Sequence, residues 1–420
     1  MNGVLGDDRV ADSSVVGVAA AISVPARGHL DWIDVLRGVA ALGVAVFHAI
    51  PTLWVGAFHH IARFSATESV ASLLSYPARF GYAGVMLFFL LSGFVIHLPN
   101  AGKQEFDVRS YAARRFLRIY PPYAAALLLS VSVALLLPRV VGYHGGWFAF
   151  GKALLMLQNY PHPGGSLRYA ELQPAGNFAL WSLPIELELY LVYPLVLLAS
   201  RRWGVRQASF AVVVSALAAT LVDMCLGPAS GVLSTIAGSV PAFLHYLVIW
   251  CAGALLADRL AKGDIPKWDG RWTMFFAVGA ALSLSARYVL KLPVDVEDFL
   301  WASTFWCGLV WIVAHPGVRA TLASSALAPM RYLGTISYSL YLTHLPTFYI
   351  IGAACFAATG FKTTNFLMCL GACAIAILVA AVFYGLIEKP SIAFAARFGR
   401  MRARTRVASA PTLISSSSDG

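Results

Sequence analysis

Ten runs of about 20 mostly apolar residues divide this sequence, and a run of that length crosses the hydrocarbon core of a bilayer as a helix. In all, 59% of the 420 residues are hydrophobic and only 12% are charged, whereas a soluble globular protein has roughly 45–50% apolar residues. The sequence therefore predicts an all-α integral membrane protein with about ten transmembrane helices. The expected spans are 35–54, 79–99, 119–138, 181–200, 208–226, 238–257, 272–290, 299–315, 332–353 and 366–387.

The basic residues gather on alternate connections between these runs. Because cytoplasmic loops carry an excess of lysine and arginine, this alternation places those connections and both termini in the cytoplasm. It also accounts for the net charge of +11 without a nucleic-acid partner. The residues are Lys103, Arg109, Arg114, Arg115, Arg118, Arg201, Arg202, Arg206, Arg259, Lys262, Lys267, Arg271, Arg319 and Arg331, followed by arginines near the C-terminus.

The membrane domain is expected over residues 30–391, between two tails. Residues 1–29 are predicted to form a disordered cytoplasmic tail. Their apolar run SVVGVAAAISV also resembles the core of a signal peptide, but Asp7 and Asp8 make the region before it acidic instead of basic. Residues 392–420 are rich in arginine and serine, which predicts a basic cytoplasmic tail beside the membrane.

A shorter apolar stretch, WFAFGKALLMLQ, occupies residues 147–158 between the third and fourth runs. A span needs about 20 residues, so this length favours a re-entrant or interfacial helix over another crossing. We expect it to belong to an external excursion over residues 139–180. If it crossed instead, every basic connection downstream would change sides.

Two ionisable residues lie in the first run, LDWIDVLRGVAALGVAVFHA. An ionisable side chain inside a membrane costs about 2.5–3.5 kcal/mol on insertion scales and is a functional candidate by default. On a helix, the spacing of Arg37 and His48 is three turns plus about 20°, so both project from one face at depths roughly 16 Å apart. The alternatives are a headgroup anchor for Arg37 and an interhelical hydrogen bond for His48.

A carboxylate backed by hydroxyl groups lies in the fourth run, within WSLPIELELYLVYP. Ser182, Glu186 and Tyr190 recur at every fourth residue and therefore share one helix face. Glu188 points roughly to the opposite side. The competing interpretation is a helix start, because a proline and acidic residues suit a first turn.

Three arginines cluster before the third run, in VRSYAARRFLRIYPPY. Arg118 lies four residues after Arg114 and three after Arg115, so the three guanidinium groups are expected to meet on one side of the entering helix. Such groups bind phosphates bidentately and stack on flat rings. A multiply phosphorylated, nucleotide-like ligand would suit this cluster. The alternative is positive-inside charge against anionic lipid.

The ninth run contains ISYSLYLTHLP, in which Tyr341 and His344 are neighbours on a helix. Pro346, which follows, lacks an N–H and frees a backbone carbonyl. We expect Tyr341 to support a site and His344 to be structural or gating more than catalytic. The six cysteines lie in or beside apolar runs without a metal-ligand spacing, so the sequence predicts no metal site.

Taken in order, these stretches resemble the motifs of the membrane acyltransferase-3 family, the polytopic O-acyltransferases of bacterial polysaccharides and related molecules. The matching stretches extend over almost all of residues 30–391. They are the arginine, ten residues and histidine from Arg37 to His48, then GVMLFFLLSGFVI, RRFLRIYPPY, WSLPIELELYLVYP, SYSLYLTHLP and GLIEKPS. Six motifs in the same order are a more specific signal than any one of them.

The resemblance implies ten membrane helices, an acyl-CoA donor on the cytoplasmic side, usually acetyl-CoA, and transfer of the acyl group to a hydroxyl. It makes Arg37 and His48 the essential pair. The sequence departs from the family pattern at one place. Members often carry two adjacent glutamates after WSL, whereas Leu187 separates Glu186 from Glu188 here. A role that needs two neighbouring carboxylates is therefore in doubt.

We accordingly expect an acyl-CoA-dependent O-acyltransferase of the bacterial inner membrane. Its acceptor would be a carbohydrate or glycolipid, such as an exopolysaccharide, an O-antigen or a lipid-linked sugar. His48 would act as base or nucleophile, Arg37 would hold a donor phosphate or the thioester arm, and Glu186 would orient His48 or the acceptor hydroxyl. Arg114, Arg115 and Arg118 would bind the CoA phosphates, with Ser182, Tyr190, Tyr341 and His344 in support. No tightly bound cofactor is expected, and the oligomeric state stays open.

The rival interpretation is a transporter or flippase for a glycolipid or polysaccharide, without acyl chemistry. Buried arginine, histidine and glutamate side chains would then line a translocation path. This class predicts paired, broken half-helices and no use of CoA. No inverted repeat is apparent in the sequence, and the arginine cluster fits a CoA donor better. A purely structural scaffold would leave the buried ionisable residues unexplained.

Overall fold

The computed structural model describes residues 30–53, 75–103, 105–141, 147–160, 176–226, 232–265, 267–360 and 365–397. Within these ranges the chain is built from helices and contains no strand. The predicted all-α membrane class is therefore confirmed. The tail predicted over residues 1–29 and most of the tail over 392–420 lie outside the described residues.

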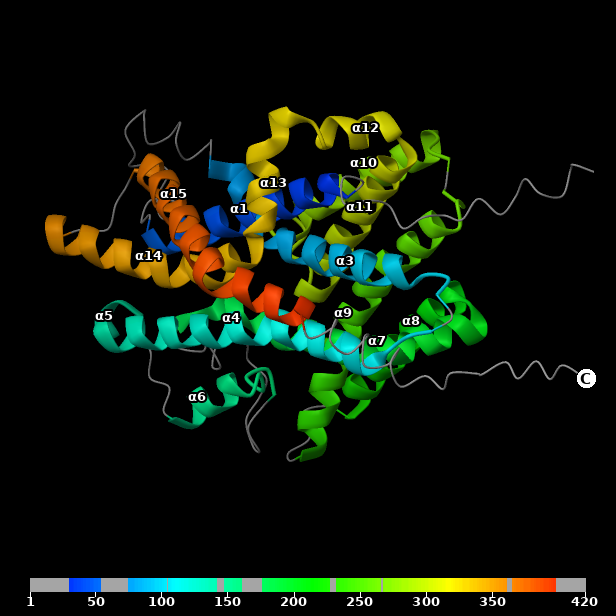
Figure 1. Ribbon diagram of the computed structural model, residues 1–420, viewed down its shortest axis with the longest axis horizontal. Coiled ribbons are helices and arrows are strands. Elements are labelled where there is room, and N and C mark those ends of the chain that lie inside the picture. Colours follow the sequence, from blue (N-terminus) through cyan, green and yellow to red (C-terminus); the bar gives the residue numbers. More distant parts are fainter. Residues whose placement is uncertain are drawn as a thin grey trace, which may run out of the picture.

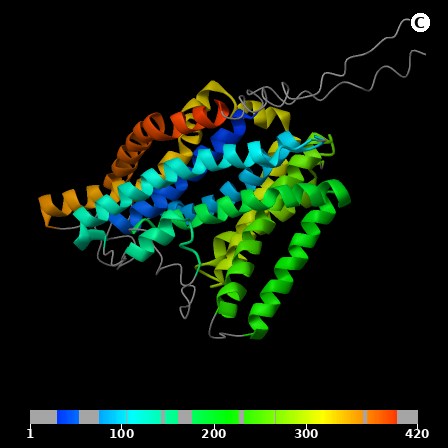
Figure 2. The same cartoon turned by 60° about the horizontal axis from the view of Figure 1, so that its bottom comes forward.

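The helices pack side by side in a bundle, as Figures 1 and 2 show. The longer ones are α1 (Asp31–Leu53), α3 (Gly84–His97), α4 (Val108–Leu136), α7 (Ser182–Trp203), α8 (Val205–Leu226), α9 (Val232–Ala261), α10 (Gly270–Ala286), α11 (Val294–Ala314), α14 (Ser337–Thr359) and α15 (Phe366–Phe383). The shorter ones are η4 (Tyr76–Ala83), η5 (Leu98–Asn100), α5 (Pro138–Val141), α6 (Trp147–Leu154), η7 (Phe178–Trp181), α12 (Pro316–Leu322), η8 (Ser325–Leu327), α13 (Ala328–Thr335) and η9 (Tyr384–Glu388).

Nine helical stretches among the described residues are long and apolar enough to cross a membrane, whereas the sequence predicts ten. The difference is the expected span 272–290, which forms α10, a helix of 17 residues. At 1.5 Å per residue α10 is about 26 Å long, a little less than the hydrocarbon thickness of about 30 Å. It packs along α11, where the hydroxyl groups of Ser283 and Thr304 lie 3.1 Å apart. A shorter helix thus takes the place of the expected span.

α1 lies at the centre of the bundle and contacts α3, α13, α14 and α15. Its contact with α13 is made backbone to backbone, because a Cβ on Gly334 would overlap the carbonyl oxygen of Asp34. Small residues permit such close approach between membrane helices. The contact fixes the first turns of α1, and with them Arg37, against the segment that leads into α14.

α4 begins at Val108, well before the expected span 119–138. The Asp107 side chain caps this start by accepting a hydrogen bond from the backbone N–H of Ser110 at 3.1 Å. The arginine cluster therefore lies on the same continuous helix as the membrane-spanning residues. Its guanidinium groups are positioned by that helix and not by a loop.

α6 forms the first part of the apolar stretch 147–158, for which the sequence favours a re-entrant or interfacial helix over a crossing. It has only 8 residues, about 12 Å of helix, which is too short to cross. The hydroxyl of Tyr123, on α4, donates a 2.6 Å hydrogen bond to the carbonyl oxygen of Ala153. Tyr120 donates to the carbonyl oxygen of Leu154 at 3.0 Å. The end of α6 thus packs against the middle of α4, as a re-entrant segment would.

Two irregular turns shape the last two spans. The expected span 332–353 is divided at Ile336, so that α13 packs on α1 while α14 enters the bundle. After α15 the chain widens into the π-helical turn η9, a feature that often occurs at functional sites. The helix then continues to Arg397, so residues 392–397 of the predicted tail are helical.

Several basic connections meet at one end of the bundle. Arg201, at the end of α7, donates a 2.6 Å hydrogen bond to the carbonyl oxygen of Lys103. Asp258, near the end of α9, lies 3.9 Å from His97 and pairs with Lys262 at 2.8 Å. By the positive-inside rule this end is predicted to face the cytoplasm. We call it the basic end, and we call the opposite end of the bundle the outer end.

Candidate active site

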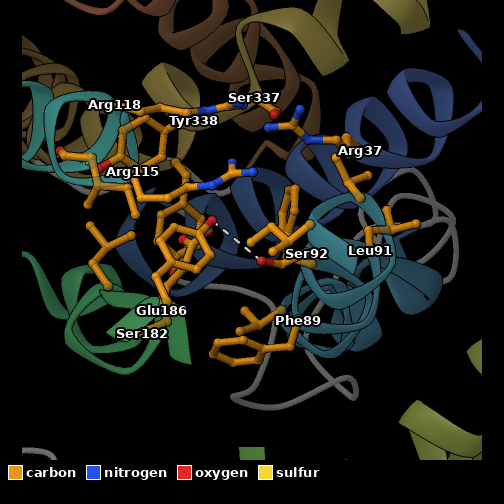
Figure 3. A pocket seen from close by; sticks show the side chains of 18 residues that line it. Arg37, Phe89, Leu91, Ser92, Arg115, Arg118, Ser182, Glu186, Ser337 and Tyr338 are labelled. Atoms are coloured by element: carbon orange, nitrogen blue, oxygen red, sulfur yellow. Dashed lines mark hydrogen bonds between the residues drawn. The ribbon is translucent and has the colours of Figure 1, made fainter. Parts of the chain in front are cut away.

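A cavity lies between α1, α3, α4, α7 and α14 (Figure 3). Most of its wall is apolar, and α3 contributes more lining residues than any other helix. Its charged lining consists of three arginines and Glu186. Ligand sites are typically apolar clefts with a few convergent polar groups, and this cavity has that character. We call it the arginine cavity.

The three arginines come from two helices that are distant in sequence. Arg37, on α1, and Arg115 and Arg118, on α4, all line the arginine cavity (Figure 3). Arg114 was predicted to join them, but its side chain is exposed and does not line the cavity. Position 114 lies on another side of the same helix turn, so the structure brings together two of the three predicted guanidinium groups, and it adds Arg37 to them.

Guanidinium groups lie close enough together at this end of the cavity to act on one another. Arg37 and Arg118 repel each other. The carboxylate of Asp34 lies 3.7 Å from Arg37, and Glu186 and Glu388 also attract it. An anionic ligand with more than one negative group would relieve the repulsion between the guanidinium groups.

Glu186 is held by its own helix. The hydroxyl of Tyr190, one turn further along α7, donates a hydrogen bond to its carboxylate. Tyr190 in turn accepts from the hydroxyl of Ser92 at 3.4 Å, and the guanidinium of Arg115 lies 5.4 Å from the centre of its ring. The predicted face of α7 is therefore turned into the cavity. Glu188 instead accepts a 2.7 Å hydrogen bond from Tyr160 on the other side of the helix.

Ser182 and Tyr341 close the deep end of the arginine cavity. Their hydroxyl groups are hydrogen-bonded at 2.8 Å, and both residues line the cavity. The ring of Tyr341 lies 6.0 Å from the ring of His344, which itself is not part of the cavity wall. The side chain of Tyr341 thus separates the cavity from His344.

His48 and His344 form a buried pair just beyond that end. Nδ1 of His48 and Nε2 of His344 are 2.8 Å apart, and the two rings are nearly parallel, with centres 5.0 Å apart and an angle of 6° between their planes. Only 8% of His48 and none of His344 is exposed. The sequence predicted that Glu186 would orient His48 or the acceptor hydroxyl, and the partner that the structure gives His48 is a histidine. We call this pair the histidine dyad.

The partners of the histidine dyad determine where its hydrogens lie. Nδ1 of His344 is 2.9 Å from the carbonyl oxygen of Leu340. A carbonyl oxygen only accepts, so this nitrogen carries a hydrogen. In a neutral His344, Nε2 is then an acceptor, and it takes its hydrogen bond from Nδ1 of His48. A neutral His48 therefore has its free lone pair on Nε2, which is the atom available as base or nucleophile.

Asn177 holds η7 against the part of α14 that carries His344. Pro346 has no N–H, so the carbonyl oxygen of Leu342 lacks its usual helical partner. The side-chain amide of Asn177 donates to this oxygen at 3.0 Å and to the hydroxyl of Ser130 at 3.0 Å. The next residue, Phe178, packs its ring 4.8 Å from the ring of His48. The freed carbonyl expected from the sequence is thus used to position the residue that covers the dyad.

Glu388 was not among the predicted site residues. The π-helical turn η9 directs it into the bundle, where it is 1% exposed and accepts a 2.5 Å hydrogen bond from Ser339 on α14. Arg118 and Arg37 are the cations that act on its carboxylate. The sequence signal that could have found it is the motif GLIEKPS, which contains Glu388 and is one of the stretches that resemble the family motifs.

The chain matches the acyltransferase domain family, the acyltransferase-3 family, over residues 30–385, and it belongs to that family. YrhL of Bacillus subtilis, whose name proposes a peptidoglycan O-acetyltransferase, is 28% identical over 311 residues. The acyltransferase MdmB of Streptomyces mycarofaciens is 25% identical over 370 residues, and the exopolysaccharide production protein ExoZ of Rhizobium meliloti is 27% identical over 340.

These three alignments differ in how much of each relative they cover. They cover 66%, 84% and 77% of this chain in that order. They cover 46% of YrhL, 90% of MdmB and 92% of ExoZ, so the chain spans about half the length of YrhL. No solved structure matches the chain.

Proposed function

We propose that this protein transfers an acetyl group from acetyl-CoA, bound from the cytoplasmic side, to a hydroxyl of a carbohydrate-type acceptor in the bacterial inner membrane, with His48 as the general base. The observation that carries this proposal is the position of the histidine dyad at the deep end of the arginine cavity. Membership of the family supports acyl transfer. The names of YrhL and ExoZ support a polysaccharide acceptor.

The arginine cavity suits the donor because CoA carries phosphates at one end of a long arm and the thioester at the other. Arg115 and Arg118 would bind the phosphates at the basic end, and Arg37 would hold a further phosphate or the arm. The arm would then follow the apolar wall of α3 towards the dyad. The roughly 16 Å between the depths of Arg37 and His48 leaves room for an extended chain.

At the dyad, Nε2 of His48 would take the proton from the acceptor hydroxyl as its oxygen attacks the thioester carbonyl carbon. The new C–O bond forms, the C–S bond breaks, and the protonated imidazole returns the proton to the departing thiolate. The products are an acetyl ester and free CoA. His344 would keep the lone pair of His48 on Nε2, because Nε2 of His344 accepts the hydrogen bond from the N–H at Nδ1 of His48. His344 is thus a positioning residue in this proposal.

The hydrogen bond between Ser182 and Tyr341 lies between the cavity and the dyad. The acetyl end of the donor would reach His48 by displacing the Tyr341 side chain from Ser182. In the empty cavity the same hydrogen bond would shield the dyad from cytoplasmic water. This assigns Ser182 and Tyr341 a shared role at the passage to the reacting centre.

A transfer assay tests the proposal. Membranes from a host that lacks the gene, carrying either the wild-type protein or His48→Gln, are incubated with acetyl-CoA labelled in the acetyl group, and label is counted in protein, lipid and glycan fractions. We expect label in the glycan or glycolipid fraction with the wild type and a fall of at least about 100-fold with His48→Gln, since general acid–base catalysis contributes 10²–10⁴-fold. Equal expression and equal melting temperature serve as controls.

Each other outcome points to a specific error. Undiminished glycan labelling with His48→Gln overturns the role of His48. Label that accumulates on His48 in the wild type replaces the general base by a nucleophile. No labelled glycan or glycolipid with any variant, together with transport of a glycolipid across the membrane, leaves the flippase as the explanation.

A further inference from the structure

A second cluster of ionisable side chains lies at the outer end of the bundle, and none of its members has a role in the steps of acyl transfer described above. His245 comes from α9, Arg287 follows α10, and Glu297 and Asp298 come from the first turn of α11. His245, Glu297 and Asp298 are buried. Ionisable groups buried in a membrane protein are functional candidates by default, and three of them gather here beside Arg287. We call these four residues the outer cluster.

The outer cluster has hydrogen-bonding capacity that the described residues do not use. Nε and Nη2 of Arg287 both bind the same oxygen of Glu297, Oε2, at 2.9 Å. The other oxygen, Oε1, is buried and has no hydrogen-bond partner among the described residues. Glu297 itself is 1% exposed. Nε2 of His245 also lacks a hydrogen-bond partner there, since Asp298 Oδ2 is 3.6 Å away.

Aromatic rings adjoin these charges. The guanidinium of Arg287 lies 3.8 Å from the centre of the Tyr82 ring, and Trp301 donates its indole N–H to the Tyr82 hydroxyl at 3.1 Å. Phe80 packs against Trp301 with ring centres 5.8 Å apart. Arg287 is the open side of the cluster, because its side chain is 32% exposed. A ligand at the outer end would approach beside Arg287.

The outer cluster is connected to the histidine dyad through η4. The ring of Tyr82 lies 5.5 Å from the ring of Phe47, the residue before His48. This contact is close because η4 and α1 touch at two glycines, and a Cβ on Gly81 would overlap the carbonyl oxygen of Gly43. The dyad thus lies between the arginine cavity on one side and the outer cluster on the other.

We propose that the outer cluster is the binding site for the acceptor, a neutral, polyhydroxylated carbohydrate chain. Sugar hydroxyls would donate to the unused Oε1 of Glu297 and to Asp298. The apolar faces of the sugar rings would pack on Tyr82, which the indole N–H of Trp301 holds by a hydrogen bond. Arg287 is already paired with Glu297, so the outer cluster offers no unpaired guanidinium group to an anionic chain. The proposal rests on the proposed function, because it is that reaction which requires a hydroxyl acceptor near His48.

The test measures glycan binding and donor binding separately on the full-length protein in lipid nanodiscs. The probes are chitotetraose, cellotetraose, xylotetraose and, as an anionic chain, tetragalacturonate; acetyl-CoA is measured alongside. We expect at least one of the three neutral tetrasaccharides to bind and tetragalacturonate to bind at least tenfold more weakly. Glu297→Gln should weaken the neutral glycan at least tenfold, and its affinity for acetyl-CoA should equal that of the wild type.

The chain provides a matched control and a second variant. Asp295 lies two positions before Glu297 on the same helix and is exposed, so Asp295→Asn removes the same charge outside the cluster and should leave glycan binding unchanged. Trp301→Phe keeps the ion pair of Arg287 and Glu297 and should still weaken the glycan several-fold. It keeps the proposal testable if Glu297→Gln fails to fold.

The proposal is overturned if none of the three neutral glycans binds, or if a folded Glu297→Gln and a folded Trp301→Phe both bind them as the wild type does. Tighter binding of tetragalacturonate than of the neutral chains also overturns it. Failure of the proposed function looks different. In that case acetyl-CoA does not bind or is not consumed, whatever the outer cluster binds.

Discussion

The arginine cavity and the outer cluster are both polar centres inside a helix bundle, but they carry opposite charge. Three arginines and one glutamate line the cavity, with Glu388 nearby, whereas the outer cluster sets two carboxylates against one arginine and a histidine. The cavity is therefore suited to an anion, and the outer cluster to hydroxyl donors. The comparison teaches that one bundle can hold two polar centres of different charge, with the histidine dyad between them; in our proposal this difference keeps the donor and the acceptor apart.

The largest expected effect comes from the residue that lies between the two regions. His344→Ala removes the acceptor of the hydrogen on Nδ1 of His48, so His48 loses the partner that keeps its lone pair on Nε2. Label transfer into glycan should fall by about 100-fold. His344→Gln offers a side-chain oxygen for the same hydrogen bond and should recover part of the loss. Equal activity of the two variants would show that His344 only fills space.

The next effect concerns the positive side of the comparison. Arg115→Gln and Arg118→Gln should each weaken acetyl-CoA binding by about tenfold or more, because a hydrogen bond to a charged group contributes roughly 1.5–3 kcal/mol. Isothermal titration of the protein in nanodiscs measures this. Arg114→Gln is the matched control, since Arg114 is exposed on the same helix, and it should bind acetyl-CoA as the wild type does. A loss at Arg114 as large as at Arg115 would point to general surface charge.

A smaller effect is expected at Glu388. Glu388→Gln removes the carboxylate that acts on Arg118 and Arg37 but keeps a side chain that can accept from Ser339. The arginines then lose part of their orientation, and KM for acetyl-CoA should rise several-fold while kcat changes less. Ser339→Ala should raise KM in the same direction. A fall in kcat with an unchanged KM would place Glu388 at the reacting centre instead.

The smallest effect is expected from a residue outside both polar centres, where a substitution should change stability and not binding. Asp269 caps α10, and its hydrogen bonds from Arg271 and from the backbone N–H of Trp272 lower the pKa of its carboxyl below the usual 3.8. Because the folded-state pKa is the lower one, the stabilisation is complete at neutral pH and is lost as the pH falls through that value. Asp269→Ala should reduce Tm slightly at neutral pH and not at the lowest pH that the protein tolerates. Asp269→Asn should retain most of the cap.

Much of the fold was predictable from the sequence because it depends on composition. Lipid requires long apolar runs, and these can be counted. The exception is α10, which starts two residues before the expected span, where Asp269 caps it, and is shorter because it already ends at Ala286. The paired positions of Arg37 and His48 followed from helical periodicity. The side of α7 that bears Ser182, Glu186 and Tyr190 followed from it as well.

The partners across helices could not be predicted in this way. Periodicity places His48 on a face of α1, but it does not say which helix lies opposite, so the pairing with His344 on α14 required the packed bundle. The same holds for Arg114, because three arginines on one helix cannot all face one cavity unless the neighbouring helix curves around them. The inward position of Glu388 depends on a π-helical turn. Such a turn changes which residues share a helix face, and it has no simple sequence signature.

The arginine cavity has an electrical consequence. It extends from the basic end to the hydrogen bond of Ser182 and Tyr341, so an aqueous ligand site penetrates deep into a layer that otherwise excludes ions. A voltage across the membrane then falls mainly over the remaining thickness, where the histidine dyad lies. Moving one charge through a difference of 100 mV involves about 2.3 kcal/mol. In the proposed reaction, the positive charge on His48 would therefore be generated within the steepest part of the transmembrane field.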